Sequence, residues 1–130
     1  VTDLAGSAGK LASCIQISDA CGPALGWFAV ERHDGTVVGN VMLQPARSLP
    51  GEVEIGWHFA REHQDEGYAT EAAVLLLERA WADTETDRIV ATIVAANEPA
   101  KRVATKLGMH NSEPVVHQGV AHDLWVIDRP

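Results

Sequence analysis

Residues 52–83 read EVEIGWHFAREHQDEGYATEAAVLLLERAWAD, and the spacing of their apolar side chains changes partway along. Up to Phe59, apolar and polar residues alternate, which predicts a half-buried strand with one apolar face. From Tyr68 to Asp83, alanine and leucine recur at helical spacing, which predicts an amphipathic helix. The loop over 61–69 therefore joins the carboxyl end of a strand to the amino end of a helix, where unpaired N–H groups and the helix dipole favour an anion such as phosphate.

The segments next to this stretch predict further strands and a second helix. An Asp-Gly turn at 34–35 separates two apolar runs and predicts an antiparallel hairpin. Residues 88–96 (RIVATIVAA) are β-branched and nearly all apolar, as expected for a central strand buried on both faces. Asn97 offers a helix cap and Gly108 a C-terminal glycine, so a second helix is predicted over 98–107.

The two ends of the chain complete the predicted order. Residues 115–117 and 120–127 predict a last hairpin, whereas residues 4–17 are weakly helical. The predicted order is thus helix, three strands, helix, strand, helix and two strands. This order is typical of a mixed α/β (α+β) fold, with a mostly antiparallel central sheet and a parallel strand-helix-strand crossover from 52 to 96.

Composition and charge narrow the class of protein. The chain has 130 residues, 46% of them hydrophobic and 22% charged, with a net charge of -8. These values predict one globular domain over 1–130 that binds neither nucleic acid nor an anionic membrane surface. No run approaches ~18 apolar residues and no secretory signal is recognisable, so we expect a cytoplasmic protein. Cys14 and Cys21 fit no zinc spacing and are predicted to be free thiols.

The loop and its surroundings resemble a known family. Gln64-x-x-Gly67-x-Ala69 is similar to the Q/R-x-x-G-x-G/A signature of the GNAT superfamily of acyl-CoA-dependent N-acetyltransferases. GYATEA, which begins at Gly67, is typical of its RimJ/RimL-type branch of ribosomal-protein N-acetyltransferases. The EIGWHF strand precedes the motif, and N-x-x-x-x-x-V-x-x-K-L-G-M follows from Asn97, in the order and spacing of the family. The resemblance covers residues 24–128.

The resemblance implies a reaction and a coenzyme site. An acetyl group would pass from acetyl-CoA, as co-substrate, to an amine of a protein N-terminus or a small molecule, by direct attack on the thioester. Backbone N–H groups of 64–70 would hold the pyrophosphate, the pantetheine arm would pair with the end of the preceding strand, and Arg102 and Lys106 would face the nucleotide. The implied cofactor-binding residues are Trp57, His58, Phe59, Gln64, Asp65, Glu66, Gly67, Tyr68, Ala69, Thr70, Asn97 and Arg102.

Glu54 is the candidate catalytic residue. An acceptor ammonium must lose a proton before it attacks, and a strand carboxylate beside the cleft can take that proton directly or through water. The alternative is a solvated or salt-bridged glutamate with no chemical role. His58 lies on the same predicted face and is either a proton relay or a backbone contact to the coenzyme. The six histidines lack the spacing of metal ligands, so we expect no metal.

The chain departs from the family pattern at three places. Asp65 and Glu66 stand where many relatives have Gly-Arg or Gly-Lys, and we expect their side chains to turn outward. Ala100 stands where relatives commonly have a serine, which removes one candidate general acid. The leading strand and helix of the family are missing from the matched part, so the chain is expected to be a segment of a longer one or to have an open acceptor cleft. These departures leave a second interpretation open, a catalytically inactive CoA-binding or regulatory domain. The exposed sheet edges are compatible with a homodimer.

Overall fold

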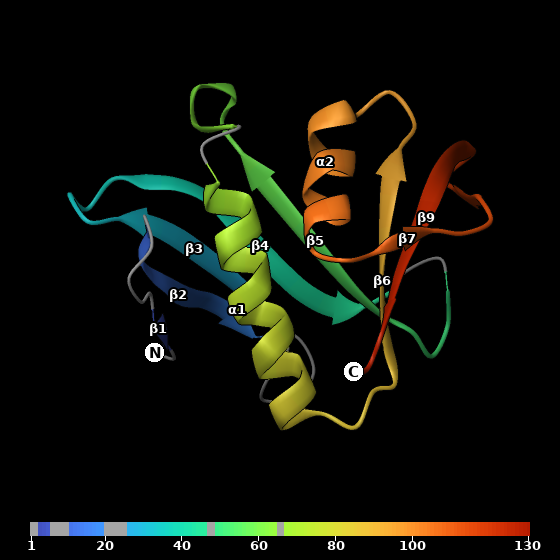
Figure 1. Ribbon diagram of the computed structural model, residues 1–130, viewed down its shortest axis with the longest axis horizontal. Helices are drawn as coiled ribbons and strands as arrows, with labels where there is room; N and C mark the ends of the chain where they lie inside the picture. The colour runs from blue at the N-terminus through green and yellow to red at the C-terminus, as the bar shows by residue number, and fades with distance from the viewer. Residues whose placement is uncertain (1–2, 6–10, 20–25, 47–48, 65–66) are drawn as a thin grey trace.

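The computed structural model describes residues 3–5, 11–19, 26–46, 49–64 and 67–130 (Figure 1). Within these ranges the chain forms nine strands of one sheet, two α-helices and a short 3-10 helix. The strands are β1 (Asp3–Ala5), β2 (Leu11–Asp19), β3 (Gly26–Arg32), β4 (Val37–Pro45), β5 (Val53–Phe59), β6 (Arg88–Val94), β7 (His110–Asn111), β8 (Val115–His117) and β9 (Val120–Asp128). The helices are η1 (Arg61–His63), α1 (Tyr68–Asp83) and α2 (Glu98–Lys106).

The sheet contains one parallel pair. Its strand order is β1-β2-β3-β4-β5-β6-β9-β7, with β8 paired to β9. The other neighbouring strands are antiparallel, whereas β5 and β6 run parallel, with Val53 opposite Ile89 and Glu54 opposite Val90. Because α1 connects these two strands, the predicted mixed sheet with a strand-helix-strand crossover is confirmed.

β5 and β6 separate soon after they meet. In the described part of the chain they share those two registered pairs and no others. β5 then stays paired with β4 as far as Phe59, while β6 stays paired with β9 as far as Val94. The two strands diverge toward their carboxyl ends (Figure 1). The sheet therefore opens into a split between the carboxyl ends of its parallel strands.

Both α-helices cover the same face of the sheet, which we call the helix face (Figure 1). α1 contacts β4, β5 and α2, and α2 contacts β6. The helical spacing seen in the sequence is confirmed, because the buried residues of α1 are Tyr68, Ala72, Ala73, Leu76, Leu77 and Ala80. They pack with buried sheet residues such as Phe28, Leu43 and Ile55 into the main core. Burying each large side chain of this kind stabilises the fold by about 1.5–3 kcal/mol.

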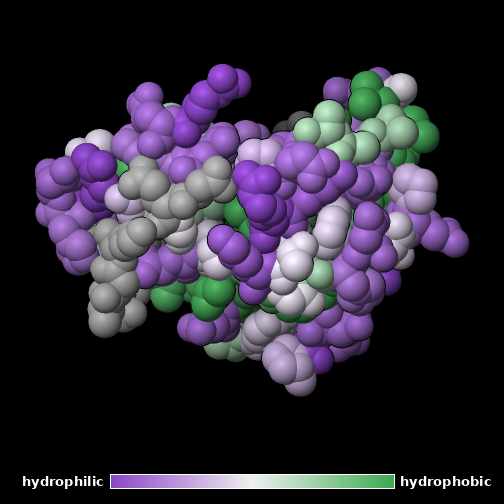
Figure 2. Space-filling model, turned by 45° about the horizontal axis from the view of Figure 1, so that its top comes forward, coloured by the Kyte–Doolittle hydropathy of each residue, from purple (hydrophilic) through white to green (hydrophobic). Residues whose placement is uncertain are grey.

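The opposite face of the sheet, here the second face, carries a smaller core. Val90, Leu124 and Val126 are buried there beneath Ala46, Leu49 and Val115. The alternation of β3, β4 and β5 also directs Trp27, Asn40, Met42, Glu54 and His58 toward this face, because their neighbours along each strand belong to the main core. Hydrophobic side chains also gather over the β8–β9 hairpin in Figure 2, where Val116 and Val120 are exposed.

One sequence prediction for the fold is wrong. The segment predicted to be weakly helical ends at residue 17, and its residues 11–17 instead lie in β2 (Leu11–Asp19), which pairs antiparallel with β3. Ile15 and Ile17 alternate with polar residues and favour a strand, and the edge of β3 supplies the backbone partner that a local pattern cannot reveal. The prediction also lacked β1 and the two-residue strand β7. The hairpins, the crossover helix and α2 are confirmed to within a few residues.

Candidate functional site

A pocket of about 170 Å³ lies at the split between β5 and β6. The end of β5, the turn before α1, the first turn of α1 and α2 line it. Among its lining residues are Trp57, His58, Phe59, Gln64, Gly67, Tyr68, Ala69, Thr70, Asn97 and Arg102, all predicted from the sequence. The other two predicted residues, Asp65 and Glu66, lie outside the described residues, as do Cys21 and the side chain of Cys14.

The end of β5 presents backbone groups to the pocket. Trp57, His58 and Phe59 pair with β4 along one edge, whereas along the edge toward β6 the described residues provide no ladder partner. An extended ligand can therefore pair with this edge as an added strand would. Gln64 fixes the turn that follows, because its Nε2 donates a hydrogen bond to the carbonyl oxygen of Phe59 at 3.1 Å.

Gly67 begins α1 in a conformation that suits glycine. Its φ is 87° and its ψ is -1°, a left-handed geometry, and no side chain caps the helix at this position. Glycine at the cap position has no side chain to accept from the N–H groups of the first turn, and a helix N-terminus carries about half a positive charge. Tyr68, the first residue of α1, is buried beside them. The turn is therefore suited to hold an anion.

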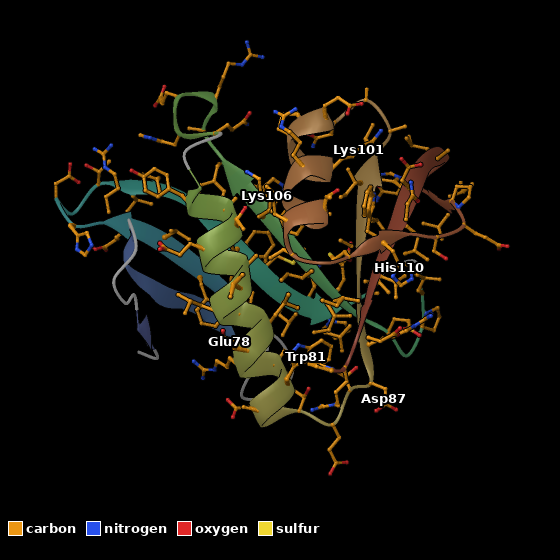
Figure 3. All side chains as sticks on the ribbon, in the orientation of Figure 1. Glu78, Trp81, Asp87, Lys101, Lys106 and His110 are labelled. Atoms are coloured by element: carbon orange, nitrogen blue, oxygen red, sulfur yellow. The ribbon has the colours of Figure 1, made fainter. Side chains whose placement is uncertain are left out.

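α2 forms the opposite wall of the pocket. Asn97 caps the helix, since its Oδ1 accepts a hydrogen bond from Ala100 N at 3.2 Å. Arg102 and Lys106 lie further along α2 and line the same pocket. Figure 3 shows Lys106 between α2 and the amino end of α1. Two cationic side chains thus lie near the positive end of the α1 dipole, which strengthens the preference for an anionic ligand.

Glu54 lies beside the split, outside the pocket lining. It occupies the last registered pair of β5 and β6, opposite Val90, and its carboxylate is directed to the second face. Its Oε2 accepts a hydrogen bond from Thr92 Oγ1 at 2.7 Å. Sequence reasoning missed Thr92, although it is the one hydroxyl in the nearly all-apolar RIVATIVAA segment. Glu54 is thus half-buried and held across the split by β6.

His58 joins the pocket to the second face. It lines the pocket, yet its exposed ring is stacked on Trp27, with centroids 6.4 Å apart and planes inclined by 6°. Asn40 lies opposite His58 on β4, and its Oδ1 is buried without a hydrogen-bond partner. The second face beside the split is therefore a wall of aromatic and polar groups.

Within the described ranges, no three His, Cys, Asp or Glu side chains lie close enough together to hold a metal ion. Neither of the α-helices described here is long and apolar enough to cross a membrane.

The chain that carries this site matches a known protein family. The family model described as an acetyltransferase (GNAT) domain matches residues 2–110, so this chain belongs to the GNAT acetyltransferase family. The match begins ahead of residue 24, where the motif resemblance starts, and includes the ranges of β1 and β2.

Individual relatives agree with this assignment. The uncharacterised protein YkkB of Bacillus subtilis (strain 168) is 34% identical over 90 residues, which are 68% of this chain and 52% of YkkB. The chain thus spans about half the length of that relative. The acetyltransferase (GNAT family) of Bacillus anthracis superposes with a TM-score of 0.63 at 28% identity, covering 77% of this chain and 63% of that one. RimJ of Mycobacterium smegmatis, in complex with CoA-disulfide, superposes with a TM-score of 0.66 at 24% identity, covering 80% and 53%.

Proposed function

We propose that this chain binds acetyl-CoA at the split and transfers its acetyl group to an amine. The observation that carries the proposal is the convergence on one pocket of an uncapped helix turn, an unpaired strand edge and two cations. Membership of the GNAT family supports it, as does the resemblance in fold to a RimJ structure solved in complex with CoA-disulfide.

Each part of the pocket suits one part of the coenzyme. The N–H groups of the first turn of α1 would bind the pyrophosphate, because they are uncapped and lie at the positive end of the helix dipole. The edge of Trp57 to Phe59 would pair with the amide groups of the pantetheine arm. Arg102 and Lys106 would neutralise phosphate charge from the α2 side.

Glu54 is the proposed base for the acceptor. The coenzyme supplies an activated acetyl thioester at the split. The acceptor ammonium loses one proton to Glu54, directly or through a water molecule, and its freed nitrogen lone pair forms the new bond to the acetyl carbon. The carbon–sulfur bond then breaks, the nitrogen gives up its second proton, and the leaving sulfur takes up that proton, so CoA departs as the free thiol. Thr92 holds one carboxylate oxygen of Glu54 at 2.7 Å, which leaves the other oxygen available to the acceptor.

A catalytically inactive CoA-binding or regulatory domain is the second candidate function. Ala100 favours it, because this position lines the pocket and offers no hydroxyl to protonate the leaving thiolate. Under this proposal the pocket would bind the coenzyme while the chain released no CoA.

Two measurements on the chain separate these functions. Acetyl-CoA at one hundred times its Kd stabilises a binding protein by about 2.7 kcal/mol, which thermal unfolding detects readily. Release of free CoA thiol is then followed with a panel of amines, including peptides with free N-termini. Stabilisation with thiol release supports the enzyme, and stabilisation alone supports the inactive domain. Absence of stabilisation contradicts both. Dephospho-CoA provides a matched ligand that tests the contact with the nucleotide phosphate.

A further inference from the structure

The second face beside the split carries three groups that attract positive charge. Glu54 directs its carboxylate there, Asn40 has a buried carbonyl oxygen without a donor, and Trp27 presents an aromatic ring. The face of such a ring attracts a cation within about 6 Å of its centroid. The three groups come from three adjacent strands, β5, β4 and β3, and so form one continuous strip.

The strip leads to the split. Met42 lies opposite both Trp27 on β3 and Gly56 on β5, so these three residues form one row across the sheet. Gly56 lies between Glu54 and His58 on the same strand, and the buried side chain of Met42 fills the space over it. A Cβ built at Gly56 would lie 2.6 Å from Met42 Cε and 3.3 Å from its Sδ. A slender ligand that reaches from Trp27 to Glu54 would therefore lie across Met42.

Asn40 lies on this strip with a covered carbonyl oxygen. Its Oδ1 has almost no surface exposed to solvent and accepts no hydrogen bond from the described residues, so a ligand reaches it only where a covering side chain moves aside. An unsatisfied buried acceptor is unfavourable, which favours a donor at this place. The stacking of His58 on Trp27 holds the aromatic ring in place beside it. Each of these features favours a ligand that brings hydrogen-bond donors and positive charge.

We propose that this strip is an acceptor subsite for a small amine that carries a second positive charge. The inference rests on the proposed function, because the reacting amine must meet the thioester at the split. The reacting amine lies near Glu54, and the second cation lies over Trp27. Two strand spacings separate β5 from β3, so the two charges are roughly 10 Å apart.

A matched pair of amines tests the subsite. Hexamethylenediamine and hexylamine have the same carbon chain, and only the diamine has a second ammonium group. We expect a KM for the diamine roughly tenfold below that for hexylamine, the range that one cation–π contact provides. Trp27→Leu should remove most of this difference while leaving the KM for acetyl-CoA unchanged, and Trp27→Phe should retain most of it. Aminocaproate, with a carboxylate at the far end, should be the poorest acceptor.

Binding without the coenzyme gives an independent measurement. Titration of hexamethylenediamine should shift the NMR signal of the His58 Cε1 proton, since this ring is stacked on Trp27, and hexylamine should shift it less. Equal KM values for the two amines, or equal losses for both in Trp27→Leu, would overturn the subsite. Thermal stabilisation by acetyl-CoA with thiol release from amines, but without discrimination between them, would overturn this inference alone. Absence of both responses would overturn the proposed function.

Discussion

Replacing Gly67 with alanine tests whether the first turn of α1 binds the coenzyme. Gly67 has a φ of 87°, and an alanine in this region costs about 1–2 kcal/mol. No atom of the described residues lies within 4 Å of a Cβ built there, so backbone strain is the expected effect. Without ligand the turn relieves the strain by changing φ, which redirects the first N–H groups. Binding must restore the original geometry, and the Kd for acetyl-CoA should rise about 5- to 30-fold.

Gly51 provides a matched control for this substitution. It has the same φ of 87° and likewise no atom within 4 Å of a built Cβ, but it lies in the loop before β5 and does not line the pocket. Gly51→Ala should lose up to about 1–2 kcal/mol of unfolding free energy, or roughly 3–10 °C in Tm, and bind acetyl-CoA as the unmodified chain does. Isothermal titration calorimetry measures the Kd of both variants. Equal affinities for Gly67→Ala and Gly51→Ala would refute the reasoning.

Three further substitutions test the other contacts. Thr92→Val removes the 2.7 Å hydrogen bond to Glu54 and should lower kcat about tenfold, while the KM for acetyl-CoA stays unchanged. Thr92→Ser keeps the hydroxyl and should restore kcat. An unaltered pH profile of kcat in Thr92→Val would contradict a positioning role. Arg129→Met removes three hydrogen bonds, of 2.6 to 3.0 Å, to carbonyl oxygens at and after the end of α1. The free energy of unfolding, measured in urea, should fall by about 2–4 kcal/mol. A loss below about 1 kcal/mol would show that water replaces these hydrogen bonds. The pKa of Asp34 is lowered from 3.8 to about 2, mainly by the hydrogen bond from the Thr36 N–H. The stability that the Asp34 carboxylate contributes is present above pH 3.8 and is lost as pH falls through about 2. An Asp34→Asn variant should therefore be less stable than the unmodified chain above pH 3.8 and equally stable near pH 2. A difference in unfolding free energy that stays constant over this pH range would contradict the lowered pKa.

Local patterns predicted the elements that surround the pocket. The alternation before Phe59 and the helical spacing after Gly67 are strong because one face of each element is buried in the same core. The family motif then identified the lining residues, since Gln64 and Gly67 have local roles that their residue types reveal. The strand at 11–19 escaped prediction because β3 supplies its pairing from elsewhere in the chain.

The arrangement of the second face could not be predicted in the same way. Alternation indicates that Glu54 and His58 share a face, but it does not reveal that Thr92 crosses the split or that Trp27 stacks on His58. These contacts join residues from different strands, so they depend on strand order and register. The position at which β5 and β6 separate is likewise tertiary information, because each strand follows a different antiparallel neighbour.

The brief pairing of β5 with β6 leaves little backbone hydrogen bonding between the two parts of this sheet. Strands β1 to β5 form one leaf and strands β6 to β9 another, and two registered pairs join their backbones in the described chain. The main core, which contains residues of both leaves, and the contact of α1 with α2 hold the leaves together. A molecule that pairs with the free edge of β5 adds backbone hydrogen bonds where β6 forms none with that edge. Occupancy of the gap would then stiffen the whole domain, and slower amide exchange in both leaves would reveal it.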